Sequence, residues 1–193
     1  MDNLQHPVVL FTHGAGSRGS DRNLIARHPV VSKMLPLLGD AILIAPQCAK
    51  DTWFDCFEHL IGLAEKIASC PDIDQSRIYG IGVSMGGYAM LQLMQSCPEL
   101  FAAGLICCGG GMYWNAERLK RIPLRLFHGE DDTVVYPAES RYMAEKINAC
   151  GGNAALTVYP DCDHNCWDRT FENAENLKWL MSQIKKENQH AAI

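Results

Sequence analysis

Short apolar runs alternate along the chain with longer segments in which hydrophobic residues recur at helical spacing. The runs are rich in Val, Ile and Leu, which is typical of strands buried on both faces of a parallel sheet. We expect six strands, at Val8–Thr12, Ala41–Ile44, Arg77–Ile81, Ala103–Ile106, Leu124–Phe127 and Ala155–Tyr159. We expect four helices, at Phe57–Cys70, Gly86–Cys97, Ala138–Ala149 and Asn173–Lys186.

This alternation predicts an α/β fold, with a mostly parallel sheet of about six strands and helices on both faces. At 193 residues the chain has the length of one domain, so we expect a single core spanning residues 1–193, with fraying from Glu187 to Ile193. The segment Met112 to Arg121 has room for one short helix. We therefore expect no large lid and an open or shallow site.

Composition and charge argue against a nucleic-acid-binding protein and against a membrane-spanning one. Hydrophobic residues make up 48% and charged residues 20%, and the net charge is −5 with scattered Lys and Arg, which argues against a nucleic-acid partner. No run approaches the roughly 18 apolar residues of a membrane span, and the first residues lack a basic, apolar leader. Nine cysteines without a repeated C-x-x-C pair fit reduced thiols. We expect a cytoplasmic protein.

The strongest chemical signal is the G-x-S-x-G segment from Gly82 to Gly86, which follows an expected strand and opens an expected helix. In that context the serine stands on a sharp, strained turn, where flanking side chains would clash, so glycine is required on both sides. Chance alone produces the bare pattern in on the order of one chain in ten of this size. The context predicts Ser84 as a nucleophile.

A serine hydroxyl needs a base within hydrogen-bond reach. His164 follows the last expected strand, where such a base belongs, whereas the other six histidines lie near termini, before the serine turn or in strand-end turns. An acid that orients the histidine should follow the strand at Leu124–Phe127, and Asp131 and Asp132 both do. Spacing alone leaves these two open, and the other one would cap the next helix.

Two backbone N–H groups should stabilise the developing oxyanion, one after the nucleophile and one in the loop after the first strand. They are expected at Met85 and at Ala15, within the glycine-rich segment that starts at His13. That segment lacks the Lys-Ser/Thr ending of a phosphate-binding loop. Cys162 and Cys166 flank His164 but lack the second close ligand pair of structural zinc motifs. We expect no metal and no organic cofactor.

These motifs together resemble the phospholipase/carboxylesterase-like branch of α/β-hydrolases, which includes predicted peptidases and relatives of dienelactone hydrolase and feruloyl esterases. The likeness runs from His13-Gly14-Ala15-Gly16 through Gly82–Gly87 and His128-Gly129-x-x-Asp132 to His164. The resemblance implies Asp132 as the acid and Ala15 as an oxyanion donor. It also implies that Trp53 and Trp167 line the acyl or alcohol pocket, although Trp167 is equally compatible with a role in ordinary packing.

Two departures stand out from the relatives. Only about seven residues precede the first expected strand, which predicts a trimmed sheet. The residue before the histidine is Asp163 where relatives carry glycine, and its carboxylate is expected to favour the protonated imidazole.

The resemblance implies a hydrolase that cleaves short-chain or aryl esters through an acyl-enzyme, with a small-molecule ester as partner and a monomer or homodimer as assembly. Thioesterase or small-peptidase activity would use the same residues, and a non-catalytic ligand-binding scaffold is the rival from another class. A hydrolase based on Cys162 or Cys166 is a further alternative, although neither cysteine lies on a strand-to-helix turn.

Overall fold

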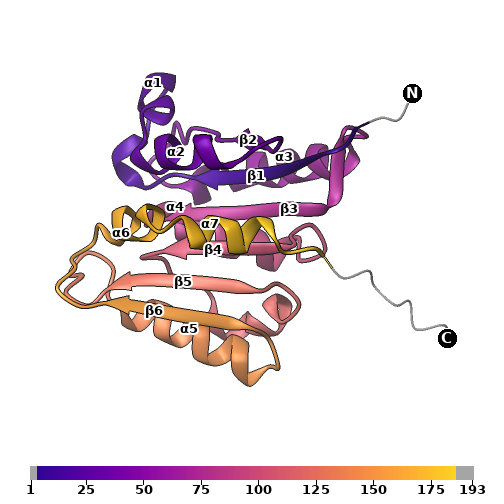
Figure 1. The fold of residues 1–193 in the computed structure, drawn as a ribbon. Helices are drawn as coiled ribbons and strands as arrows, with labels where there is room; N and C mark the ends of the chain where they lie inside the picture. The colour runs from indigo at the N-terminus through magenta and orange to yellow at the C-terminus, as the bar shows by residue number, and fades with distance from the viewer. Residues whose placement is uncertain (1–3, 186–193) are drawn as a thin grey trace.

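The computed structural model describes residues 4–185, and the expected fraying from Glu187 to Ile193 lies outside this range (Figure 1). Six parallel strands form one sheet in the order β2-β1-β3-β4-β5-β6. They are β1 (His6–Thr12), β2 (Ile42–Ile44), β3 (Ile73–Val83), β4 (Ala103–Cys107), β5 (Leu124–Gly129) and β6 (Ala154–Tyr159). The predicted six-stranded parallel sheet is confirmed.

Strand β3 begins at Ile73, four residues before the predicted start at Arg77. The added length arises because Ile73 pairs with His6 of β1, before a shift in the register of the two strands.

Within residues 4–185, seven α-helices connect or flank the strands: α1 (Arg22–Ala26), α2 (Pro29–Met34), α3 (Phe57–Ser69), α4 (Met85–Ser96), α5 (Ala138–Ala149), α6 (Cys166–Glu172) and α7 (Ala174–Met181). Four short 3-10 helices accompany them: η1 (Ala15–Ser17), η2 (Leu35–Leu37), η3 (Trp53–Cys56) and η4 (Tyr113–Leu119). The four predicted helices are present, but the last ends at Met181, five residues before the predicted Lys186. Helices α1, α2 and α6 were not predicted, because five to seven residues are too few to show a helical period.

Two hydrophobic cores lie on opposite faces of the sheet. Helices α3, α4 and α5 cover one face, where Val8, Leu10 and Ile78 of the strands pack against them. Helices α2, α6 and α7 cover the other face, over Val9 and Phe11 (Figure 1). Alternate residues of β1 therefore belong to different cores, as the period of a strand requires. This arrangement explains why the strand sequences are apolar at almost every position.

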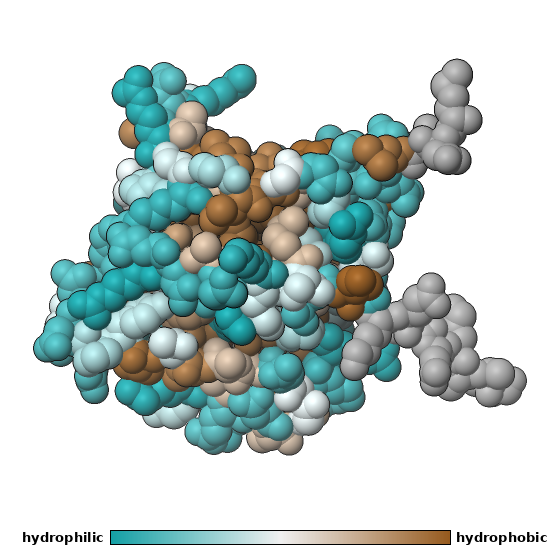
Figure 2. All heavy atoms as spheres, viewed as in Figure 1, coloured by the Kyte–Doolittle hydropathy of each residue, from teal (hydrophilic) through white to brown (hydrophobic). Residues whose placement is uncertain are grey.

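The hydropathy of the surface varies over the face that Figure 2 shows. Hydrophobic side chains gather near β2, whereas hydrophilic residues predominate around α6. Leu35, Leu37 and Ile42 are among the exposed hydrophobic residues. Between β4 and β5 the chain forms η4, in agreement with the single short helix expected there. In the described part of the chain, no helix is long and apolar enough to cross a membrane.

Candidate active site

The turn between β3 and α4 carries Ser84 in a strained backbone conformation. Its φ of 53° and ψ of −124° lie in a region that residues other than glycine rarely adopt. The Ser84 backbone N–H donates to the carbonyl oxygen of Cys107 at the end of β4, at 2.9 Å. The neighbouring strand thus holds the turn in place, with the serine at the carboxyl edge of the sheet.

Glycine on either side of Ser84 is a steric requirement. A Cβ atom on Gly82 would lie 2.5 Å from the carbonyl oxygen of Gly86, and one on Gly86 would lie 2.0 Å from the carbonyl oxygen of Thr12. Both contacts are with backbone atoms, so no change of rotamer relieves them. The sequence pattern G-x-S-x-G is therefore explained by close packing of β1, β3 and α4 around the turn.

His164 lies in the loop after β6 and faces the serine. Its Nε2 is 2.8 Å from the Ser84 hydroxyl oxygen, and its Nδ1 is 2.7 Å from Oδ2 of Asp132. The Nδ1 proton is donated to the carboxylate, so Nε2 is left to accept the proton of the serine hydroxyl. The side chain of His164 is 21% exposed, which leaves this nitrogen within reach of a ligand at the sheet edge.

Asp132, and not Asp131, contacts the histidine. Asp132 is buried, and its Oδ1 accepts the backbone N–H groups of Val134 and Val135 at 2.8 and 2.9 Å. Burial raises its pKa, but the hydrogen bonds from His164 and these two amides outweigh burial and bring the pKa below the usual value. The carboxylate is therefore held in its charged form at neutral pH. Asp131 is exposed, and its backbone N–H donates to the carbonyl oxygen of Cys162.

His128, which was expected only in a strand-end turn, also contacts the acid. Its Nε2 lies 3.2 Å from Oδ2 of Asp132 and 2.8 Å from the carbonyl oxygen of Val135, and its Nδ1 lies 2.7 Å from the Ser140 hydroxyl. The side chain is fully buried. The spacing of His128 and Asp132 in the H-G-x-x-D segment was the signal that could have identified this contact.

The loop after β1 passes directly beside the nucleophile. A Cβ atom on Gly14 would lie 3.3 Å from Cβ of Ser84. Ala15 is the first residue of η1, and Met85 is the first residue of α4. Backbone N–H groups in the first turn of a helix have no acceptor within that helix. The two amides expected to bind an oxyanion therefore belong to the two segments that meet at Ser84.

Segment 47–53 holds this loop by five hydrogen bonds. Nε2 of the buried His13 accepts the Cys48 N–H at 2.9 Å, so the His13 Nδ1–H donates to the Gly14 carbonyl oxygen. Burial lowers the pKa of His13, although the bond to Gly14 opposes this effect. The remaining bonds are Gly19 N–H to Cys48, Gln47 to Ser17, Arg18 to Asp51 and the Trp53 indole N–H to the His13 carbonyl oxygen.

The structure places Trp53 behind the loop that carries Ala15. The side chain is 2% exposed, and its ring lies against that of His13 at 4.9 Å between centroids. Trp53 also lines a cavity of about 260 Å³ together with Cys56, His59, Leu60 and Leu63. Trp167 is half-buried, and its ring meets the His164 imidazole edge-on at 5.5 Å.

An acidic groove lies on the outer side of the His164 loop. It has a volume of about 630 Å³ and is lined by Asp131, Asp161, Asp163, Asp168, Glu172 and Arg169, among others. Asp163 is exposed, and its carboxylate accepts the backbone N–H of Asn165 at 3.0 Å. The carboxylate next to the histidine thus takes part in the turn of its own loop.

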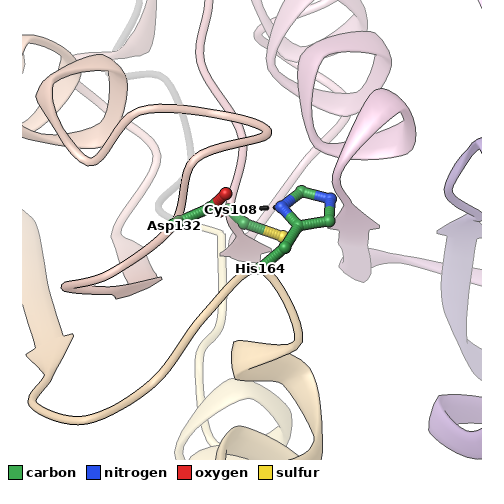
Figure 3. Close-up of side chains that lie close together, drawn as sticks. All are labelled: Cys108, Asp132 and His164. Atoms are coloured by element: carbon green, nitrogen blue, oxygen red, sulfur yellow. Dashed lines mark hydrogen bonds and ion pairs between the residues drawn. The ribbon is translucent and has the colours of Figure 1, made fainter.

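Within residues 4–185, one group of three potential metal ligands has its ligand atoms within 4.8 Å of one another: Cys108, Asp132 and His164 (Figure 3). Asp132 and His164 are already joined by a hydrogen bond. The group includes neither Cys162 nor Cys166, the two cysteines that flank His164 in the sequence. Cys162 donates to the Asp163 carbonyl oxygen, and Cys166 donates to that of Phe127.

Comparison with solved structures identifies similar esterases. A thermostable esterase matches with a TM-score of 0.86 and 34% identity over 94% of this chain, which spans 56% of that esterase. Esterase PE8 matches with a TM-score of 0.72 and 19% identity over 92% of this chain and 94% of its own. An acylaminoacyl peptidase from Pyrococcus horikoshii matches with a TM-score of 0.69 and 15% identity. The match extends over 96% of this chain and 38% of the peptidase.

A search of curated protein sequences gives no significant match. The family model for phospholipases and carboxylesterases, in contrast, matches residues 45–179. That range contains the serine turn, the acid loop and the histidine loop. The chain belongs to the phospholipase/carboxylesterase family and has the α/β-hydrolase fold.

Proposed function

We propose that this chain is a carboxylesterase-type serine hydrolase that cleaves short-chain or aryl esters. The observation that carries the proposal is the continuous chain of hydrogen bonds from the Ser84 hydroxyl through His164 to Asp132, at 2.8 and 2.7 Å. The three residues come from loops at the carboxyl edge of one sheet and meet without any rearrangement. The esterase that is 34% identical supports the same reaction class.

In this mechanism the Ser84 oxygen attacks the ester carbonyl while Nε2 of His164 accepts its proton. Asp132 orients the imidazole and stabilises its positive charge. The amides of Ala15 and Met85 bind the oxyanion of the tetrahedral intermediate. His164 then gives its proton to the leaving alcohol, and water repeats the cycle to release the acid and free Ser84.

The substrate class follows from what lies around Ser84. Only the short helix η4 stands between β4 and β5, so there is little cover for a long acyl chain. Trp53 and Trp167 are the proposed pocket aromatics. A small-molecule ester is the proposed partner of a monomer or homodimer, and no cofactor is required. All nine cysteines are free thiols, which supports a cytoplasmic location.

Labelling with a fluorophosphonate probe tests the nucleophile. Wild-type protein should be labelled, and Ser84→Ala should not, whereas the exposed Ser69→Ala serves as the matched control and should be labelled like wild type. Hydrolysis of p-nitrophenyl esters of two to twelve carbons should favour the shorter chains. A folded wild-type protein that neither reacts with the probe nor cleaves esters would refute the proposal in favour of a ligand-binding scaffold.

Two further assays separate the alternatives within enzymes. The first compares the rates of hydrolysis of an ester, a thioester and a peptide that carry the same acyl group. The fastest of the three identifies the preferred leaving group. Iodoacetamide should leave activity intact, since the proposed nucleophile is not a cysteine. A cysteine-based reaction would be indicated if iodoacetamide inactivated the wild-type protein and if replacement of Cys162 or Cys166 also removed the activity.

A further inference from the structure

Cys108 is a non-glycine residue in a backbone conformation that favours glycine. Its φ is 41°, and within residues 4–185 only Ser84 and Asp161 share a positive φ among non-glycine residues. The Cys108 N–H donates to the carbonyl oxygen of Phe127 at 2.8 Å, which fixes this backbone to β5. The next three residues are all glycine. In segment 108–111, Cys108 is thus the residue with a positive φ and also the one residue that carries a side chain.

That side chain is buried against the proposed catalytic pair. Cys108 is fully inaccessible to solvent. Its Sγ, a carboxylate oxygen of Asp132 and a ring nitrogen of His164 all lie within 4.8 Å of one another. Figure 3 shows the Cys108 sulfur next to the His164 imidazole. The thiol therefore lies beside the hydrogen-bonded pair of Asp132 and His164 and is itself closed off from solvent.

The thiol is uncharged at neutral pH. Burial raises the pKa of Cys108 far above its usual value, and the adjacent Cys166 raises it further. An uncharged, polarisable sulfur packs well against a ring and does not repel the neighbouring carboxylate. The same protonation makes Cys108 a poor nucleophile, so its contribution is to packing and to the exclusion of water.

We propose that Cys108 is a positioning residue for the active site. Its thiol holds the His164 imidazole in line between Asp132 and Ser84 and excludes water from the hydrogen bond between Asp132 and His164. This inference rests on the proposed function, in which His164 is the general base. Removal of the sulfur would let the ring tilt and would admit water to the carboxylate, which weakens its hold on the protonated imidazole. A small shift of a base costs turnover more than binding.

The test is a graded series at this position. Cys108→Gly relieves the backbone strain and removes the packing, Cys108→Ala removes only the sulfur, and Cys108→Ser replaces the sulfur with an atom of similar reach. We expect kcat to fall about 10- to 100-fold in Cys108→Gly with little change in KM, and to recover in part in Cys108→Ala and further in Cys108→Ser. The acid limb of the pH profile should move to lower pH in Cys108→Gly.

Asp161→Gly is the matched control, because it relieves a positive φ of 50° at an exposed position. It should leave kcat and the pH profile unchanged. Thermal unfolding establishes that each variant is folded. Should Cys108→Gly fail to fold, the alanine and serine variants decide the question by the same readouts. Wild-type kcat and a wild-type pH profile in the folded variants would overturn the proposal.

A readout that does not depend on turnover keeps this inference separate from the proposed function. The proton between His164 Nδ1 and Asp132 should give a far-downfield signal in proton NMR. We expect this signal to weaken or vanish in Cys108→Gly but to persist in Asp161→Gly. If wild type cleaves no ester and binds no fluorophosphonate, the proposed function fails, while this signal still decides the role of Cys108. An unchanged signal in Cys108→Gly contradicts that role.

Discussion

The hydroxyl of Thr12 donates a hydrogen bond of 2.7 Å to the carbonyl oxygen of Gly86, and a Cβ atom on Gly86 would lie 2.0 Å from the carbonyl oxygen of Thr12. The end of β1 and the start of α4 therefore touch through their backbones. Gly86→Ala must push these segments apart and should destabilise the protein by about 3 kcal/mol or more. Urea unfolding followed by circular dichroism measures the change.

Gly62→Ala is the matched control for this prediction. Gly62 lies within α3, and a Cβ atom there would meet nothing within 4 Å. Alanine in the middle of a helix should stabilise the protein by about 0.5–1 kcal/mol relative to glycine. Equal unfolding midpoints for the two variants would contradict the close contact between Thr12 and Gly86.

Asp132→Asn should reduce kcat by a factor on the order of 10³–10⁴, because an amide no longer holds the imidazole in the tautomer that accepts the serine proton. Asp131→Asn, one residue earlier and exposed, should stay within a few-fold of wild type. The measurement is steady-state ester hydrolysis by folded variants. A larger loss in Asp131→Asn than in Asp132→Asn would reverse the proposed assignment of the acid.

Trp53→Phe removes the indole N–H that donates to the His13 carbonyl oxygen at 2.9 Å. Loss of one hydrogen bond, about 1 kcal/mol, should loosen the loop that carries Ala15. We expect turnover to fall several-fold to tenfold for esters of every chain length. Trp114→Phe, at a position that is 72% exposed, should have no effect.

The same variant tests whether Trp53 lines the acyl pocket. In that role the replacement would change the preference for chain length and KM, and not turnover alone. A profile of kcat and KM over esters of two to twelve carbons separates the two roles. An unaltered profile with unaltered kcat would exclude both.

Acid should destabilise the protein through His28. This residue is 8% exposed, and its Nδ1 accepts the Val30 N–H at the start of α2. Burial, with a smaller contribution from His13 and against an opposing one from Asp168, lowers the pKa of His28 to about 4. Between pH 6.5 and 4 the unfolded chain binds the proton and the folded one does not. Stability should therefore fall across this window by at most about 3 kcal/mol.

His28→Asn isolates this effect, because asparagine can accept the same helix-start hydrogen bond and does not titrate. The variant should lose less stability than wild type when urea unfolding is compared at pH 7 and pH 4.5. Identical losses in both proteins would assign the acid sensitivity to other groups.

Much of the fold was predictable because parallel strands buried on both faces read as apolar runs. The six strands and the four longer helices were found in this way. The serine turn was found from its G-x-S-x-G pattern, whose glycines are required by close backbone contacts. The short helices α1, α2 and α6 were not predictable, since five to seven residues are too few to show a helical period. Asn173, where the predicted last helix begins, accepts the Glu175 N–H with its side chain and separates α6 from α7.

The succession of strands and helices, and the residue types at the ends of the strands, can be read from the sequence alone, because they depend on neighbours along the chain. Spacing could not separate Asp131 from Asp132, and it gave His128 and Cys108 no part in the site. Their contacts arise only in the tertiary structure, which brings loops that are distant in the sequence to one edge of the sheet. Which carboxylate meets His164, and which thiol lies beside the pair, depends on backbone directions that only the folded chain defines.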